Sequence, residues 1–420
     1  MELLLPFVER HRKIQWGSTL EYPSTRSLKL YTHRIFNRYP ARSISLVPRQ
    51  ILQSYKDVCE TTGTVLDPFM GSGTTAIEGF LAGFSVVGLE IDPFARLVTE
   101  VSTTVFNDAE LEQLREYHKH ILGFFENKNL TAQVPQLYNL NYWFSEENMT
   151  DLLRLKAAID IILDSNTKAH NFFRLVLADI VRPCSKAERQ TLKPYISKKH
   201  IKTPAPVKET YKKSFEQYLQ ATREFSQATK HYKLDFKWTG FNAIDFQVEN
   251  AVDLAITSPP YLNALDYTRC IKIESAWAGC ADDLIIKAVK NSQVGDESRK
   301  ATETTDDTIN IIDEYVTQIG KIDARRASVA IQYFEDMRFN LICTYNALRV
   351  GGEYHLIVGN SVIRDIEVPT HELLAKIGEK IGFVWSDYFR YRLKDHRLSI
   401  PRNNNGGKIE YEHVISLKKV

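Results

Sequence analysis

The hydrophobic and polar positions change their period several times along the chain, and the first change marks a compact unit. A short apolar run at 64–66 predicts a buried strand, and a polar stretch with two glycines follows it at 67–73. Residues 74–81 then favour a helix, and 85–91 favour a second apolar strand. Strand, loop, helix and strand in this order predict one βαβ unit of a doubly wound α/β sheet.

A long helical stretch interrupts the sheet pattern. Four amphipathic segments lie at 109–125, 146–164, 168–181 and 206–229, and a further helical segment precedes the first strand at 34–56. The sheet pattern then returns as a strand, helix, strand, helix and hairpin, at 253–257, 333–348, 354–358, 370–381 and the carboxyl-terminal 35 residues. We therefore predict a Rossmann-like domain formed by 1–105 and 241–420, with a helical insertion at 106–240.

The composition is typical of a globular protein, with 43% hydrophobic and 25% charged residues. The five cysteines have no CxxC spacing and no histidines at metal-ligand intervals, so we expect no metal site. The apolar run at 3–7 is too short for a signal sequence or a membrane span. We expect a cytoplasmic protein without a membrane partner.

The loop after the first strand, DPFMGSGTT at 67–75, has the features of a cofactor site. Gly71 and Gly73 let the backbone approach a ligand closely and adopt positive φ. The loop lacks the lysine of an ATP-binding P-loop and the third glycine of a nicotinamide site. An adenosyl ligand remains, with Glu90 at the end of the next strand to bind its ribose hydroxyls. Asp245 is placed either to bind the adenine amine or to stabilise a turn.

The tetrad Ser258-Pro259-Pro260-Tyr261 follows the strand at 253–257. Two prolines stop the strand and stiffen a loop at the sheet edge where ligands bind. The exocyclic amine of a nucleobase is a poor nucleophile because its lone pair is delocalised, and Ser258 and the Pro259 carbonyl can each accept one amine hydrogen. Tyr261 would stack on a base flipped out of the duplex. Alone, the tetrad also fits a strand-terminating turn; beside the cofactor loop it predicts catalysis.

A basic segment lies inside the helical insertion. Residues 182–213 carry a net charge of +8, whereas the rest of the chain sums to −6. Such a distribution is typical of a polyanion binder, although a solvated loop would have the same composition. The dipeptide Pro183-Cys184, which occurs in cytosine-C5 methyltransferases, lies in a helical pattern away from the sheet edge, so we do not expect Cys184 to be the nucleophile. A second basic loop, at 392–402, belongs to the terminal hairpin.

With both motifs in place, the chain resembles the amino-methyltransferases of restriction–modification systems, in particular the cytosine-N4 group. The resemblance covers 30–105 and 240–420 and rests on HRIFNRYPARSISLVP, VLDPFMGSGTTAIEGFLAGFSVVGLEIDPFA and DLAITSPPYLNALDY. It implies S-adenosylmethionine as cofactor, duplex DNA as substrate, and a restriction endonuclease of the same target sequence as a partner. A serine at the first tetrad position points to cytosine, since adenine enzymes mostly have aspartate there.

The resemblance and the motifs together predict three sets of residues. The catalytic set is Ser258, Pro259, Pro260 and Tyr261. The cofactor set is Asp67, Phe69, Gly71, Gly73, Thr74, Glu90, Ile91 and Asp245. The DNA-contacting set is Arg182, Lys186, Arg189, Lys198, Lys199, Arg397 and Arg402.

Three other functions stay open at this point. An adenine-N6 DNA methyltransferase would have the same fold and cofactor. An RNA guanine-N2 methyltransferase has a similar cofactor loop, but commonly carries an RNA-binding domain before it, and only about 60 residues precede the loop here. A catalytically silent DNA-binding subunit would have no need to keep the glycines, Glu90 and the whole tetrad.

Overall fold

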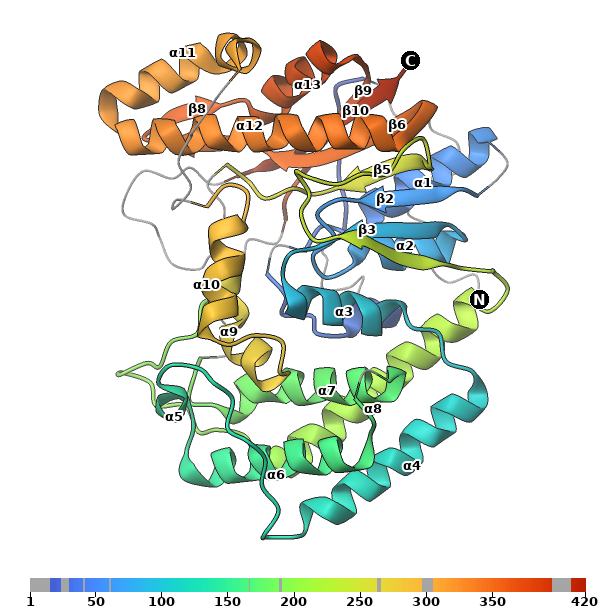
Figure 1. Cartoon of the computed structure of the whole chain (residues 1–420), viewed down its shortest axis with the longest axis vertical. Coiled ribbons are helices and arrows are strands. Elements are labelled where there is room, and N and C mark those ends of the chain that lie inside the picture. The colour runs from blue at the N-terminus through green and yellow to red at the C-terminus, as the bar shows by residue number, and fades with distance from the viewer. Residues whose placement is uncertain are drawn as a thin grey trace.

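The computed structural model describes residues 16–23, 30–40, 42–59, 62–165, 167–188, 191–262, 266–296, 305–394 and 409–420. Within these residues, a mostly parallel sheet has the strand order β1-β9-β10-β6-β5-β2-β3-β4 (Figure 1). Its strands are β1 Ser18–Leu20, β2 Thr64–Asp67, β3 Ser85–Leu89, β4 Phe236–Gly240, β5 Val252–Thr257, β6 Leu348–Gly359, β9 Phe383–Arg392 and β10 Tyr411–Lys419. A separate ribbon pairs β7 Ser361–Ile363 with β8 Ile366–Val368.

Strand β10 is antiparallel to both of its neighbours, β6 and β9. The pairs β4–β3, β3–β2, β2–β5 and β5–β6 are parallel, so these strands end at one edge of the sheet. Apolar side chains point to both faces of the central strands. Val65 and Leu254 belong to one core cluster, whereas Leu66 and Ala255 belong to another on the opposite face. Burial on both faces explains the continuous apolar runs seen in the sequence.

Helices cover both faces of the sheet, which confirms the predicted α/β class. The helices that pack on or beside it are α1 Leu46–Cys59, α2 Thr74–Ala82, α3 Pro93–Thr103, α11 Asp306–Ile322, α12 Ala324–Ala347 and α13 Thr370–Ile381. Helix α1 shares a cluster with β2 and β5, and α12 and α13 share the cluster on the other face. The βαβ unit predicted from the sequence is formed by β2, α2 and β3.

The second part of the molecule is helical and lies beneath the sheet in Figure 1. It contains α4 Asp108–Phe125, α5 Leu140–Trp143, α6 Glu146–Ile162, α7 Lys168–Cys184 and α8 Val207–Thr229. Each of the four predicted amphipathic stretches is one of these helices. Two further helices, α9 Tyr267–Trp277 and α10 Asp283–Ser292, follow the tetrad and connect the two parts. Helix α9 contributes Cys270, Ile271 and Trp277 to the helical core.

The structure differs from the sequence-based expectations in three places. The segment 34–56 contains a 3-10 helix at Tyr31–Arg34 and then α1, which begins only at Leu46. The predicted helical segment 106–240 ends in β4, which pairs with β3 as an edge strand of the sheet. Helices α9, α10 and α11 were not predicted, because their apolar positions lie between polar stretches that read as loops.

Candidate active site

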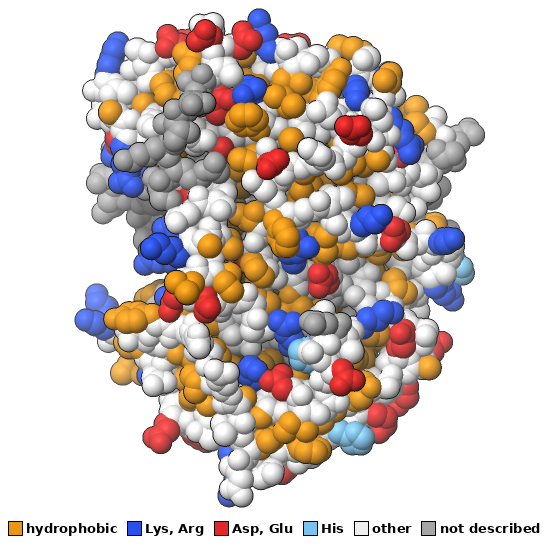
Figure 2. All heavy atoms as spheres, in the orientation of Figure 1, with side chains coloured by type: hydrophobic (Ala, Val, Ile, Leu, Met, Phe, Trp, Pro, Cys, Tyr) orange, Lys and Arg blue, Asp and Glu red, His pale blue; other side chains and the backbone are white. Residues whose placement is uncertain are grey.

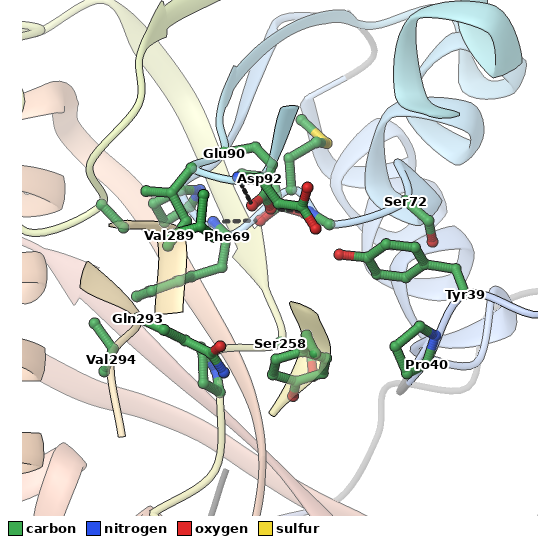
Figure 3. A pocket seen from close by; sticks show the side chains of 18 of the residues that line it. Tyr39, Pro40, Phe69, Ser72, Glu90, Asp92, Ser258, Val289, Gln293 and Val294 are labelled. Atoms are coloured by element: carbon green, nitrogen blue, oxygen red, sulfur yellow. Dashed lines mark hydrogen bonds between the residues drawn. The ribbon is translucent and has the colours of Figure 1, made fainter. Parts of the chain in front are cut away.

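A cavity of about 920 Å³, measured with its open mouth, lies at the carboxyl ends of β2, β3 and β5. Ligand sites in open α/β sheets lie at this edge. Of the predicted cofactor and catalytic residues, eight line the cavity: Asp67, Phe69, Gly71, Thr74, Glu90, Ile91, Ser258 and Pro260. The two motifs, almost 190 residues apart in the chain, therefore meet in one cavity (Figure 3).

The glycine loop has the backbone shape that its sequence predicts. Gly71 and Gly73 both have positive φ, 54° and 80°, a region that costs other residues strain. Gly73 is the N-cap of α2 and does not itself line the cavity. A Cβ on Gly73 would lie 2.8 Å from Thr99 Oγ1 and 3.2 Å from Thr99 Cα. Gly73 thus allows α2 to begin close against α3, and Thr74, the first residue of α2, faces the cavity.

Three carboxylates, the buried Asp67 and Asp92 and the half-buried Glu90, form what we call the acidic floor of the cavity. Glu90 accepts hydrogen bonds from the backbone N–H of Gly71 at 2.7 Å and of Asp92 at 2.9 Å. Asp67 Oδ1 accepts from the Thr257 hydroxyl at 2.6 Å and from the backbone N–H of Phe69 at 3.0 Å. The main chain therefore fixes these carboxylates in place.

Burial changes the acidity of the whole floor. Desolvation, with the nearby charge of Asp92, raises the pKa of Glu90 to about 7. Desolvation likewise raises the pKa of Asp67 and the pKa of Asp92, each to about 6. Neighbouring backbone hydrogen bonds only partly offset the desolvation. Three carboxyls whose charge is costly in this environment favour a ligand that brings positive charge and hydrogen-bond donors.

The sequence did not identify Asp92, although it stands two residues after Glu90. Its Oδ1 accepts from the backbone N–H of Phe94 at 2.9 Å and caps α3. Its Oδ2 is buried and has no hydrogen-bond partner among the described residues. A buried acceptor without a partner is costly, so a donor from a ligand in the cavity would satisfy it. Figure 3 shows Asp92 beside Glu90 at the cavity wall.

The segment before α1 forms the opposite wall of the cavity. Tyr39, Pro40, Arg42 and Ser43 all line it, and the Tyr39 hydroxyl points toward the acidic floor (Figure 3). Arg42 Nε donates to Ser72 Oγ at 2.7 Å, and its Nη1 donates to the His33 carbonyl at 3.0 Å. Arg42 thereby ties this wall to the glycine loop. The sequence analysis included no residue of this segment in the cofactor set.

Side chains from helix α10 and the residues at its end close the cavity from the side of the tetrad. Helix α10 contributes Val289, and Gln293 and Val294 follow at its end. The sequence analysis proposed no role for the stretch after Lys290. Its place in the wall depends on the connection of α9 and α10 to the helical core, which no local pattern reveals.

Asp245 does not lie where the sequence analysis placed it. Its side chain is exposed, on a turn after β4, and it does not line the cavity. Phe241, Asn242 and Ala243 line the cavity instead. The prediction was wrong because β4, and not β5, delivers this turn to the cavity, so the residues that directly follow β4 face the ligand.

The tetrad divides between two environments. Ser258 and Pro260 line the cavity, but Pro259 and Tyr261 do not. The Tyr261 hydroxyl donates to Glu412 Oε1 at the start of β10. Burial and the neighbouring Glu412 raise the pKa of Tyr261 well above its usual value, so the phenol is neutral. Tyr261 thus lies beside the cavity wall, with its hydroxyl directed to the sheet.

The basic segment 182–213 contains two kinds of cation. Arg182, which we predicted to contact DNA, is buried at 4% exposure. Its Nε donates to Glu274 at 2.8 Å and its Nη2 donates to the Cys270 carbonyl at 2.6 Å, so α7 and α9 are joined through it. The prediction for Arg182 was wrong, because an acid 92 residues away in the chain neutralises it.

The other predicted DNA contacts have different surroundings. Lys198 and Lys199 are exposed, and the Lys186 ammonium lies 6.0 Å from the centre of the Tyr142 ring. Arg189, Arg397 and Arg402 lie outside the described residues. Cys184 is fully buried at the end of α7, away from the cavity lining, which agrees with its exclusion as a nucleophile.

Among the described residues, no group of three His, Cys, Asp or Glu side chains is arranged to hold a metal ion. None of the helices so described has the length and apolar character that a membrane crossing requires.

No model of a protein family matches the chain. It is 22% identical over 423 residues to the type II methyltransferase M.MvaI of Kocuria varians, which covers 93% of this chain and 90% of that protein. The chain is a relative of the type II methyltransferases. It is also 28% identical over 261 residues to the type II methyltransferase M.BsoBI of Geobacillus stearothermophilus, covering 55% of this chain and 50% of that protein.

A solved structure of a SAM-dependent methyltransferase from Methanosarcina mazei aligns with 86% of this chain and 93% of its own, at 10% identity. Its TM-score of 0.29 is too low to establish a shared fold. The resemblance seen in the sequence implies S-adenosylmethionine as the cofactor, and the similarity to type II methyltransferases agrees with it. The cavity fits this ligand, because the acidic floor suits a cation and the buried Asp92 Oδ2 suits a hydroxyl or ammonium donor.

Proposed function

We propose that this methyltransferase relative transfers a methyl group to the N4 amine of cytosine in duplex DNA. The observation that carries the proposal is the meeting of Ser258 and Pro260 with the acidic floor in one cavity. A serine that ends a parallel strand beside the cofactor site suits an acceptor for an amine hydrogen. Its hydroxyl can accept from a neutral amine without the charge that an aspartate would bring.

The cofactor set keeps its predicted roles in this proposal, apart from Asp245. Glu90 would bind the ribose hydroxyls, since both of its oxygens are held at the end of β3 by backbone amides. Asp67 and Gly71 would surround the methionine part, and the N-terminus of α2 at Thr74 adds a favourable dipole for a carboxylate. When bound, the cofactor supplies an electrophilic methyl group on a sulfonium.

The chain's own residues then prepare the amine. Ser258 Oγ and the Pro259 carbonyl would each accept one hydrogen, so that the amine lone pair is turned toward the electrophilic methyl group. Pro260 stiffens the loop that holds both acceptors, because its ring fixes φ. Tyr261 would stack on the flipped base, a contact of about 1–3 kcal/mol that offsets part of the cost of unstacking.

Duplex DNA as the substrate is supported by the relatives and by the surface. The relatives are described as type II methyltransferases, which points to a restriction–modification system with a separate endonuclease. Lys and Arg side chains flank the indentation at the left edge of the molecule in Figure 2, between the sheet and the helical part. Lys186, Lys198 and Lys199 would contact phosphates, and Arg189, Arg397 and Arg402 remain predicted contacts.

Methyl transfer from tritiated S-adenosylmethionine tests the proposal, with DNA from an unmodified host and tRNA offered in parallel. We expect label in DNA, and loss of at least about 100-fold in rate for Ser258→Ala, since the variant removes an oriented acceptor. Ser165→Ala, at an exposed position between α6 and α7, is the matched control and should keep the wild-type rate. Label in tRNA alone would contradict the proposal and favour the RNA alternative.

A further inference from the structure

A buried acid links the tetrad to the last strand of the sheet. Glu412, the second residue of β10, is 8% exposed and accepts the Tyr261 hydroxyl on Oε1. Its Oε2 accepts the hydroxyl of Tyr391 on the neighbouring strand β9. One carboxylate therefore receives two tyrosine O–H groups, and its two oxygens face opposite directions. Burying a carboxylate costs free energy, so packing alone would not favour an acid at this position. The two neutral tyrosine donors therefore form an unusual arrangement.

The contacts continue from Tyr391 to Tyr22 and helix α1. Tyr391 is fully buried and makes an edge-to-face contact with Tyr22 at 5.3 Å between ring centres. The Tyr22 hydroxyl donates to Gln50 Oε1 on α1. Glu412 pairs with Gly359 and Tyr391 in the backbone register, so its own position is set by two strands. The carboxylate is thus a fixed point against which a side chain can be oriented.

The ring of Tyr261 is confined from a second direction. A Cβ on Gly359, the last residue of β6, would lie 3.5 Å from Tyr261 Cζ. This is an ordinary van der Waals distance, so the ring lies directly beside the end of β6. Tyr261 follows Pro260, which lines the cavity, so a small rotation of this ring would move its face relative to the cavity wall.

We propose that Glu412 is a positioning residue for Tyr261: it fixes the tilt of the ring on which the target base stacks. The inference rests on the proposed function, in which Tyr261 contacts the base. Glu412 itself touches no reacting atom, and acts only by holding the tyrosine hydroxyl. Burial raises the pKa of Glu412, and the two tyrosine hydroxyls favour its charged form.

A double-mutant cycle of Glu412→Gln and Tyr261→Phe tests the link. Tyr261→Phe keeps the ring and removes the hydroxyl, and Glu412→Gln keeps the shape and weakens the acceptor. We expect each single variant to lower kcat about 10- to 100-fold, the range that follows from a small misplacement of a contact group. The KM for S-adenosylmethionine should change less than about twofold. The double variant should be no slower than the slower single variant, because both changes break the same contact.

Tyr391→Phe is the matched control, because it removes a hydroxyl from the same carboxylate and leaves the bond to Tyr261. It should lower the melting temperature about as much as Glu412→Gln, while kcat stays within about threefold of wild type. A merely structural role for Glu412 would instead lower activity equally in Tyr391→Phe and Glu412→Gln. Wild-type kcat in Glu412→Gln, or losses that multiply in the double variant, would also overturn the proposal.

Both DNA and tRNA are offered as acceptors in these assays, and the cycle is measured on whichever takes the methyl group. Label in tRNA alone would refute DNA as the substrate, and the coupling between Glu412 and Tyr261 would still be read from the same rates. Non-additive losses then support the positioning role with either acceptor. Multiplicative losses refute it with either acceptor.

Discussion

The acidic floor and the basic segment differ in the sign of their charge and in how their charged side chains are held. In the floor, the half-buried Glu90 and the buried Asp67 are anchored by backbone amides at 2.7–3.0 Å. In the basic segment 182–213, Lys198 and Lys199 are exposed, and the cations that are buried serve the fold. The half-buried Lys202 also serves the fold, because its ammonium donates to three backbone carbonyls at 2.7–2.8 Å.

The difference shows how each region recognises its ligand. A small cationic ligand of fixed shape needs carboxylates at fixed positions. The main chain of the glycine loop holds the carboxylates in place. A polyanion needs charge density, and long solvated lysines provide it without fixed geometry. Single substitutions should therefore have large effects in the acidic floor and small, cumulative effects in the basic segment.

The largest expected effect is that of Glu90→Gln on cofactor affinity. Replacing a carboxylate that is held by two backbone amides should weaken S-adenosylmethionine binding by about 10- to 100-fold, the usual range for a hydrogen bond to a charged group. Isothermal titration calorimetry measures the affinity of each variant for S-adenosylmethionine. Glu112→Gln on the exposed face of α4 is the control and should bind like wild type. Equal affinities of Glu90→Gln and the control would end the assignment of Glu90.

Gly73→Ala tests whether the backbone conformation of the glycine loop organises the acidic floor. The positive φ of 80° and the contact with Thr99 should cost about 1–3 kcal/mol of unfolding free energy, measured in urea. Gly123→Ala in α4, where a Cβ meets nothing within 4 Å, should stabilise by about 0.4–1 kcal/mol. Should the two variants behave alike, the conformation of the glycine loop would not be the reason for the glycine.

The pH dependence of cofactor binding sharpens the comparison. Because burial raises the pKa of Glu90 to about 7, the group is largely protonated at pH 6 and charged at pH 8. A cationic ligand favours the charged form, so affinity should rise as pH increases toward about 7 and level off above it, with a slope of at most about tenfold per pH unit for one proton.

The same group should act on stability with the opposite sign. Its folded pKa lies above the unfolded value, so its contribution to the stability of the cofactor-free protein is present at low pH and is lost as pH rises through about 7. Glu90→Gln should flatten both profiles. A binding profile that is equally steep in wild type and Glu90→Gln would place the titrating group elsewhere.

The smallest effect is expected from Lys198→Ala combined with Lys199→Ala. Each phosphate contact contributes about −0.9 to the slope of log affinity against log salt, so the slope should flatten by up to about 1.8. Fluorescence anisotropy with duplex DNA measures the slope, and cofactor affinity should hold. The control is Lys128→Ala with Lys230→Ala, exposed lysines outside the basic segment. An unchanged slope in the first variant would remove these lysines from the interface.

The sequence predicted the parts of the site that are local in the chain. A strand, two glycines and an acid within 27 residues define one half of the cavity, and a strand followed by two prolines defines the other. Local patterns suffice there, because the topology of an α/β sheet brings the ends of parallel strands together.

The parts that were missed depend on partners far away in the chain. Arg182 looked like a DNA contact because its partner Glu274 lies beyond the whole insertion. Glu412 gave no signal, since its contact with Tyr261 needs the pairing of β10 with β6. Asp245 was assigned to the cofactor set because the position of β4 at the sheet edge was not foreseen. Burial and strand order determine these contacts, and neither can be predicted from the local sequence pattern.

Nucleoside mass spectrometry of DNA methylated by the wild-type protein tests the central claim most directly. The DNA comes from an unmodified host, and the reaction contains S-adenosylmethionine labelled in its methyl group. The account predicts labelled N4-methylcytosine, absent from the parallel reaction with Ser258→Ala. Labelled N6-methyladenine or C5-methylcytosine, or DNA without any labelled nucleoside, would contradict it.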